Sequence, residues 1–179
     1  MIRHLLSTLA LFGFLTGPAA ASMRLTSYDI TQGAAISREQ VYSNCNGDNL
    51  SPELKWSGAP AATKSFALTL YDPDAHGGWW HWIVFAIPKD QHELKQNAGD
   101  PDRTLLPGAA MEGTNDFGSV GYGGPCPPAG DKPHRYIFTL WALDAANAPF
   151  GTDVTGDKLE PWLKTHVLAT ATLTGKYGR

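Results

Sequence analysis

The chain has 179 residues, and its 14 basic and 17 acidic side chains give a formal net charge of −3. Like charges are not gathered into blocks, so the bulk electrostatics give no reason to expect binding to nucleic acid or to an anionic membrane surface. Any site for an anion must therefore be local.

Residues 1–21 have the pattern of a secretory signal peptide. A short basic start at Arg3 and His4 precedes an apolar run from Leu5 to Leu15, and three alanines follow before Ser22. The apolar run is too short to span a membrane. We expect cleavage after residue 21, a periplasmic or secreted protein, and a single domain at residues 22–179 without a transmembrane segment.

The chain has two cysteines, Cys45 and Cys126. In a protein routed to an oxidising compartment, such a pair usually forms a disulfide, and we expect one here. The alternative is a free, reactive Cys126.

Three segments predict a mainly β domain. Residues 64–72 ("KSFALTLYD") alternate between two faces, and residues 81–88 ("HWIVFAIP") are apolar on both faces. These two segments are expected to pair across the loop between them. Residues 134–144 ("HRYIFTLWALD") form the third strong strand, whereas residues 91–121 show no sustained period and predict long connecting loops.

The end of the chain predicts one helix. Apolar residues at helical spacing place it at roughly residues 158–169, with Asp157 and Glu160 as a capping box and Pro161 in the first turn. Residues 169–178 ("ATATLTGKYG") alternate again and are expected to form a last strand.

Polar side chains stand at the ends of the three predicted strands. Asp72 ends the first strand, while His81 and His134 begin the second and third. Each has a simple structural explanation: Asp72-Pro73-Asp74 as a turn, His81 as a core histidine, and His134 as a solvated strand end. If the three ends share one edge of the sheet, however, their side chains line one pocket, beside the Gly- and Pro-rich loop "GYGGPCPP".

Several motifs together resemble the phosphatidylethanolamine-binding protein family, most closely its bacterial Raf kinase inhibitor-like branch. They are "DNLSPELKWSGAP", "YDPDA", "WWHWIVF" and "GYGGPCPPAGDKPHRYIFTLWAL", in that order, within residues 25–177. The resemblance implies a Greek-key type β-sandwich with a few peripheral helices, and a small pocket for phosphate-like anions, including phospholipid head groups. It implies these ligand-binding residues: Asp72, Asp74, Trp79, His81, Gly124, Cys126, His134 and Tyr136.

The two carboxylates of such a pocket need a role other than contact with phosphate, which they repel. We expect Asp72 and Asp74 to orient a histidine and favour its imidazolium form, or to contact the amine of a zwitterionic head group. Tyr136 adds a neutral donor and the tryptophans add apolar walls. The family often has proline where this chain has His76, so the part that His76 plays in the rim is open.

We expect a non-enzymatic binding protein that needs neither metal nor cofactor. Three alternatives remain. Two aspartates and two histidines are possible metal ligands for a hydrolase, although the H-E-x-x-H motif does not occur. A free Cys126 with His134 as base would suit nucleophilic catalysis. The third is a module that binds an unknown secreted or envelope protein through residues 91–121. Homodimerisation is implied by the resemblance alone.

Overall fold

Two antiparallel sheets form the body of the protein in the computed structural model, which describes residues 22–103 and 105–179. The predicted signal peptide at residues 1–21 lies outside the described residues. The large sheet contains, in spatial order, β6 (Met111–Glu112), β4 (Trp79–Pro88), β3 (Ser65–Asp72), β7 (His134–Leu143) and β8 (Val167–Tyr177). The small sheet contains β1 (Arg24–Thr26), β2 (Leu54–Ser57) and β5 (Glu93–Leu94).

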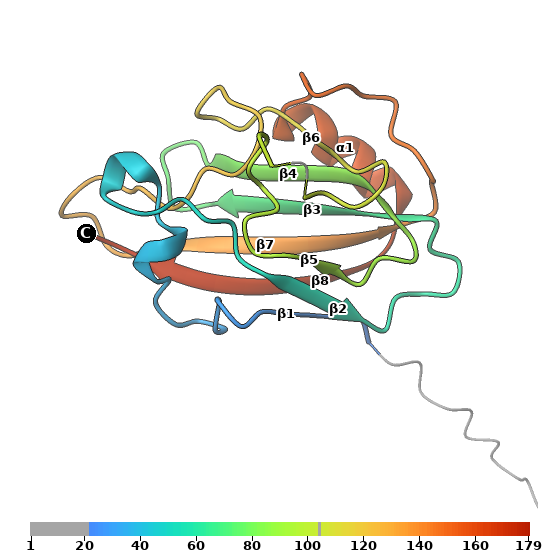
Figure 1. Ribbon diagram of the computed structural model, residues 1–179, viewed down its shortest axis with the longest axis horizontal. Helices are drawn as coiled ribbons and strands as arrows, with labels where there is room; N and C mark the ends of the chain where they lie inside the picture. Colours follow the sequence, from blue (N-terminus) through green and yellow to red (C-terminus); the bar gives the residue numbers. More distant parts are fainter. Residues whose placement is uncertain (1–21, 104) are drawn as a thin grey trace, which may run out of the picture.

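The large sheet has Greek-key order. Strands β3, β4 and β6 are successive neighbours, and β7 returns by a long connection to pair with the free side of β3. This crossover brings His134, the first residue of β7, to the edge where β3 ends at Asp72 (Figure 1). The predicted β-sandwich is confirmed.

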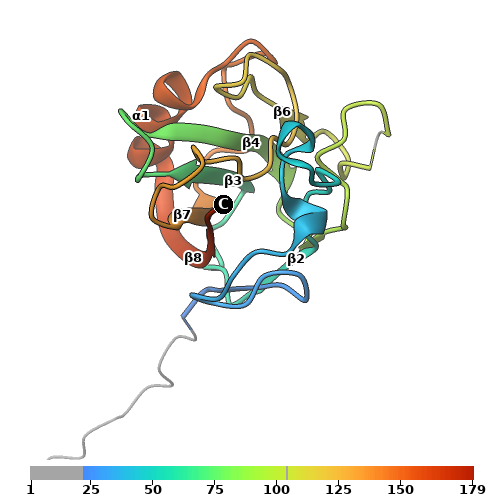
Figure 2. The ribbon, with the colours of Figure 1, turned by 90° about the vertical axis from the view of Figure 1, so that its left-hand side faces the viewer.

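The two faces of the large sheet are both covered, which explains why its central strands are apolar on both sides. The alternate residues Phe66, Leu68 and Leu70 of β3 belong to the core between the sheets. Ala67, from the opposite face, belongs to a second core with the C-terminal helix. Figure 2 shows this helix on one side of the sheet and β2 on the other.

The C-terminal helix α1 spans Gly156–His166, so the prediction of a helix near the end of the chain is confirmed but its bounds were wrong. Asp157 is not the N-cap of a capping box, because the helix begins at Gly156 after the N-cap Thr155; the Asp157 carboxylate accepts a hydrogen bond from Trp80 Nε1 (2.9 Å). With this start, Pro161 falls in the second turn. The helix ends early because Val167 is extended and begins β8, where it pairs with Leu143.

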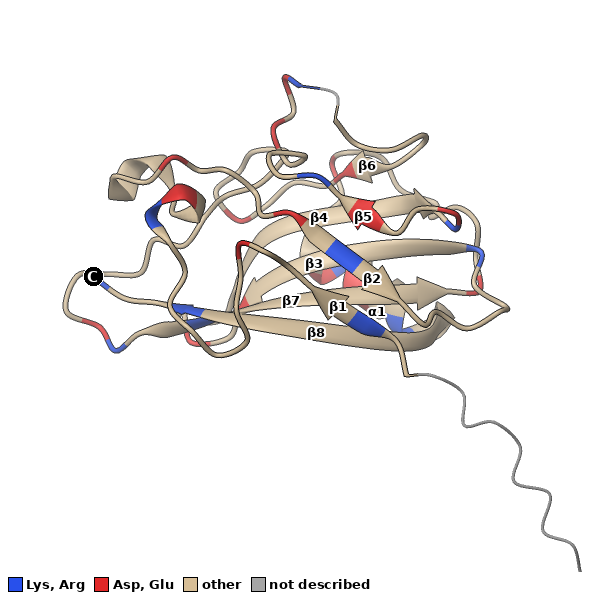
Figure 3. Cartoon of the chain, turned by 60° about the horizontal axis from the view of Figure 1, so that its bottom comes forward, with Lys and Arg blue, Asp and Glu red and all other residues tan. Residues whose placement is uncertain are grey.

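Two single-turn 3-10 helices, η1 (Arg38–Gln40) and η2 (Ser43–Cys45), lie in the connection between β1 and β2. With α1 they are the few peripheral helices that the resemblance implied. In the described part of the chain, no helix combines the length and apolar character needed to cross a membrane. Acidic and basic residues are scattered along the chain in Figure 3, as the sequence indicates.

A buried carboxylic acid lies at the edge of the large sheet. Glu112 of β6 is 5% exposed, and its Oε1 accepts a hydrogen bond from Trp82 Nε1 (2.6 Å). Burial raises the pKa of Glu112 to about 7, because the charged form loses its hydration. Glu112 is therefore largely protonated in the folded protein under mildly acidic conditions.

The substitution Glu112→Gln should make stability less dependent on pH. The raised folded-state pKa stabilises the protein below the ordinary value of 4.5, and this contribution is lost as pH rises through about 7. Relative to the variant, the wild type should lose on the order of 2–3 kcal/mol between about pH 5 and pH 8. Urea unfolding of both proteins across this range measures the loss, and a pH-independent difference would contradict the assignment.

Candidate functional site

A cavity of about 720 Å³ opens at the end of the large sheet where β3 ends and β4 and β7 begin. This is the left-hand end of the sheet in Figure 1. The sheet order is what brings these three strand ends together. Seven of the eight predicted ligand-binding residues line the cavity: Asp72, Asp74, Trp79, His81, Cys126, His134 and Tyr136.

The Asp72 carboxylate uses both oxygens to connect the turn after β3 with the start of β7. Oδ1 accepts the backbone N–H groups of Asp74 (2.8 Å) and Ala75 (3.1 Å), so the predicted turn is present. Oδ2 lies 2.7 Å from His134 Nδ1. The turn and the functional interpretation are therefore compatible, because each uses a different oxygen.

Asp72 sets the orientation of the His134 ring. Both side chains are buried, and a carboxylate that accepts from Nδ1 requires the hydrogen on that nitrogen. The other ring nitrogen, Nε2, lies 3.6 Å from Asp131 Oδ2 at the rim of the cavity. When the ring is protonated, Nε2 also carries a hydrogen and becomes a donor.

His81 is a different kind of histidine. It is 3% exposed, and its Nδ1 donates to the Gly123 carbonyl oxygen (2.7 Å). Burial lowers the pKa of His81 to about 4, because the imidazolium form would lose its hydration. His81 is thus neutral near pH 7, with the lone pair on Nε2, so of His81 and His134 only His134 remains a candidate imidazolium.

Asp74 lines the cavity. Contrary to the prediction from the sequence, its carboxylate does not orient a histidine. Arg135 donates to its carboxylate from Nε (2.9 Å), Nη2 (2.7 Å) and the backbone N–H (2.8 Å). This guanidinium lowers the pKa of Asp74 to about 2. The prediction failed because Arg135 is the next residue after His134, and sequence spacing does not reveal which of two neighbours a carboxylate reaches.

The Gly-rich loop contributes to the site in another way than predicted. Gly124 does not line the cavity: its N–H donates to Asn49 Oδ1 (2.8 Å), and a Cβ at this position would overlap the backbone of Gln40 and Tyr42. Glycine is needed there for close packing.

Cys126 lines the cavity in its oxidised form. The predicted disulfide between Cys45 and Cys126 is present, and it holds the loop against the segment that contains η2. Both cysteines of the chain are in this bond. A free Cys126 nucleophile with His134 as its base is therefore contradicted.

Two residues that line this cavity have a buried hydrogen-bond donor without a partner among the described residues. The donors are the indole Nε1 of Trp79 and the hydroxyl group of Tyr136. The Tyr136 hydroxyl is close to Asp72 but does not form a hydrogen bond of ordinary geometry with it. Burial, with a smaller effect of the Asp72 charge, raises the pKa of Tyr136, so its hydroxyl stays neutral and retains its hydrogen.

One aromatic residue of the cavity wall, Phe117, was not predicted from the sequence. The Phe117 ring lies 5.4 Å from the rings of both Trp79 and His81, and it stacks on Tyr42 at 4.3 Å. It comes from the region predicted to be connecting loops, where "NDFG" places one aromatic residue among turn formers, a weak signal. The remaining lining residues that were not assigned are Ala75, His76, Pro127, Pro128 and Asp131.

Within residues 22–103 and 105–179, no three His, Cys, Asp or Glu side chains are grouped so that they could hold a metal ion. Asp72 and His134 are bonded to each other, and His81 Nδ1 is bonded to a carbonyl. The arrangement is suited to hydrogen bonding with an anion, with neutral and ionic donors around an apolar wall.

Sequence comparison matches this chain to known proteins over nearly its whole described length. The family model described as phosphatidylethanolamine-binding protein matches residues 26–178. The UPF0098 protein YbcL of Escherichia coli K12 is 46% identical over 169 residues, which are 92% of this chain and 92% of that protein. The UPF0098 protein YbhB of the same strain is 38% identical over 159 residues, or 87% and 99% of the two chains.

Two solved structures match the fold of this chain over nearly the same share of its length. The crystal structure of E. coli YbcL, described as a new member of the mammalian PEBP family, has a TM-score of 0.86 at 45% identity and covers 89% of this chain and 99% of its own. The homologue CT736 of Chlamydia trachomatis has a TM-score of 0.75 at 34% identity, covering 88% and 98%. The family and fold that the sequence motifs implied are confirmed.

The protonation of His81 can be tested directly by NMR. Its buried ring should show the Nδ1–H tautomer with no titration between about pH 5.5 and pH 8, and should become charged only as pH falls towards about 4. Long-range ¹H–¹⁵N spectra of the imidazole nitrogens, assigned with a His81→Gln variant, make the measurement. A titration midpoint near the ordinary histidine value of 6.5 would contradict the assignment.

Proposed function

The chain belongs to the phosphatidylethanolamine-binding protein family, and on that premise we propose that it binds a phosphate-like anion, free or in a phospholipid head group. The ligand occupies the cavity at the end of the large sheet. One observation carries the proposal: Trp79 and Tyr136 line this cavity, and the indole Nε1 of the one and the hydroxyl group of the other are buried donors without a partner in the described part of the chain. A buried donor costs about 1–3 kcal/mol unless something accepts its hydrogen, and phosphate oxygens are strong acceptors.

His134 supplies the positive charge. With Nδ1 held by Asp72, its protonated ring donates to the anion from Nε2. Asp72 itself repels the anion less than a free carboxylate would, because one oxygen accepts two backbone N–H groups and the other faces the imidazolium. The bond between Asp72 and His134 thus reduces the repulsion between Asp72 and the anion, and it orients His134 Nε2 as a donor to the anion.

Asp131 provides a contact for the amine of a zwitterionic head group. Its carboxylate is exposed at the rim, 3.6 Å from His134 Nε2, so an ammonium next to a bound phosphate would meet an acceptor of opposite charge. We propose binding without a catalytic step, since both cysteines are oxidised and the histidines are bonded as described.

The anion affinity should be higher at about pH 5.5 than at about pH 8, because the charged form of histidine is the one that donates from both ring nitrogens, and Nδ1 of His134 is held by Asp72. Calorimetric titration with inorganic phosphate and with phosphoethanolamine measures this change.

Tyr136→Phe should weaken binding about tenfold at either pH, because it removes one donor to a charged acceptor. Vesicles containing phosphatidylethanolamine, added as competitors, distinguish a lipid head group from a free anion.

His134→Asn should abolish the pH dependence. His166 is a matched control, because its Nδ1 lies 2.8 Å from Asp144 in a second His–Asp pair on the surface, outside the cavity. His166→Asn should leave affinity and pH dependence unchanged. Equal wild-type affinities at the two pH values would overturn the imidazolium mechanism, and no binding of either ligand would overturn the proposed function.

We also propose that the protein is exported to the periplasm or secreted after removal of residues 1–21. The disulfide between Cys45 and Cys126 supports this, because such bonds persist in oxidising compartments. In a Gram-negative host, intact mass spectrometry of the periplasmic fraction should find a chain that starts at Ser22 with both thiols oxidised. Leu11→Arg interrupts the apolar run and should leave an uncleaved, cytoplasmic chain; cleavage of this variant would contradict the proposal.

A further inference from the structure

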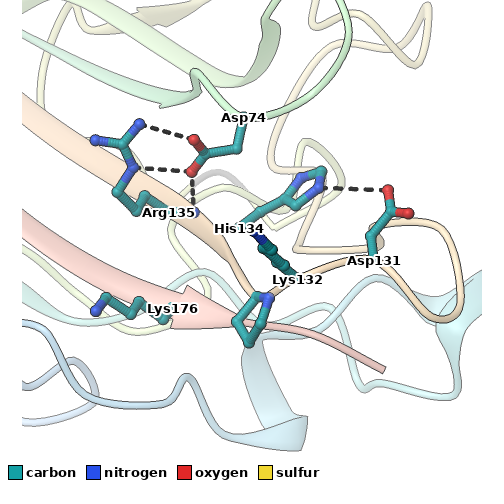
Figure 4. Close-up of a pocket in the computed structure, with 7 residues that line it drawn as sticks. Asp74, Asp131, Lys132, His134, Arg135 and Lys176 are labelled. Atoms are coloured by element: carbon teal, nitrogen blue, oxygen red, sulfur yellow. Dashed lines mark hydrogen bonds and ion pairs between the residues drawn. The ribbon is translucent and has the colours of Figure 1, made fainter.

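A second hollow, with a cavity volume of about 580 Å³, adjoins the anion cavity and shares Asp74, Asp131 and His134 with it. His134 and Arg135, the first two residues of β7, point to opposite sides of the strand end, and Figure 4 shows their side chains diverging. The second hollow lies on the Arg135 side. It is therefore close enough to the anion cavity for one molecule to contact both.

The second hollow has an excess of positive charge. Arg135 is neutralised by its hydrogen bonds to Asp74. Lys132 and Lys176 also line the hollow, and neither ammonium forms an ion pair within the described part of the chain; Figure 4 draws no dashed line from either of them to the other lining residues. Asp131 is the one lining carboxylate that Arg135 does not compensate, so the lining has two unpaired ammoniums and one such carboxylate.

The position of Lys176 needs a physical reason. Arg135 and Lys176 are directly opposite each other in the β7–β8 register, and like charges in such a pair destabilise a sheet. Asp74 compensates only Arg135, because the guanidinium donates to both of its oxygens. An anion in the hollow would compensate Lys176.

The loop that carries Lys132 is held in place, which favours a defined site. Gly130 N–H donates to the main-chain oxygen of Arg179 (2.9 Å), and Arg179 Nε donates to the Pro127 carbonyl oxygen (2.7 Å). These two bonds fix the loop before Asp131 to Arg179, and β7 begins at His134 on the other side of Lys132. Lys132 therefore approaches the hollow from a restrained backbone, which lowers the entropy lost on binding.

We infer that the ligand carries two anionic groups, one bound in the cavity beside His134 and the other in the hollow between Lys132 and Lys176. This inference rests on the proposed function and specifies its ligand class: a molecule with two phosphate-type groups joined by a short linker. Lysine ammoniums bind phosphate as point charges, so the second group needs no fixed orientation.

Two ligands that differ only in the second group test the inference. Propane-1,3-diyl bisphosphate carries two phosphates, whereas 3-hydroxypropyl phosphate has a hydroxyl group in place of one of them. Calorimetric titrations at equal ionic strength should show that the wild type binds the bisphosphate about fivefold to tenfold more tightly, the gain expected from two exposed charge contacts. Equal affinities for the two ligands would overturn the inference.

The combined substitutions Lys132→Gln and Lys176→Gln should remove this preference and leave the affinity for 3-hydroxypropyl phosphate unchanged. The matched control is Lys64→Gln with Lys89→Gln. These exposed lysines directly precede β3 and follow β4, at the opposite end of the sheet, and their loss changes the net charge equally. The preference should survive in the control. If it survives in the Lys132/Lys176 variant as well, it is a general charge effect and the inference fails.

Two further outcomes are distinguishable: whether the ligand is a lipid or a soluble molecule, and whether a negative result concerns this inference or the proposed function. Vesicles of phosphatidylcholine with phosphatidylinositol 4-phosphate carry both groups on a lipid. If they displace the bisphosphate while pure phosphatidylcholine vesicles do not, the ligand class includes lipid head groups; without displacement it is restricted to soluble molecules. Failure of the wild type to bind any of the phosphates would overturn the proposed function itself, whereas binding of the monophosphate without a bisphosphate preference overturns only the present inference.

Discussion

The bond between Asp72 and His134 is the interaction on which the geometry of the site depends. Residues 62 positions apart meet at 2.7 Å in a buried environment, and the same carboxylate closes the turn after β3 through two backbone N–H groups. A buried carboxylate is costly unless its oxygens are satisfied. Here that requirement ties together the end of β3, the loop before β4 and the start of β7.

The Greek-key order makes this bond possible, and it also divides the chemistry between two sides of one strand. His134 faces the cavity with the unpartnered donors of Trp79 and Tyr136, and Arg135 faces the second hollow. The Asp74–Arg135 pair holds the same loop from the other side of β7. The loop between β3 and β4 is thus held by two carboxylates, which explains why two aspartates occur in "YDPDA" next to the cavity that we propose binds an anion.

The local pattern of apolar residues predicted the strands that are apolar on both faces and the strands whose residues alternate regularly between two faces. The β3, β4 and β7 strands followed from their apolar periods, and seven residues that line the cavity followed from the family motifs. Other features depended on distant contacts. Asp157 was assigned to a capping box but bonds to Trp80, and the helix gave way at Val167 to the pairing of β8 with β7. Phe117 was missed because an aromatic residue in a loop has no period that announces its neighbours.

The sequence by itself determined the mainly β class, the family, the disulfide partners and seven of the residues that line the cavity, because these depend on residue type and order. Only the tertiary structure decided how the polar groups are paired. It placed Asp74 on Arg135, took Gly124 out of the cavity, and left His134 as the candidate imidazolium while burial keeps His81 neutral. Pairing and desolvation depend on distances of a few ångströms between strands far apart in the chain, and no local pattern of residues encodes these distances.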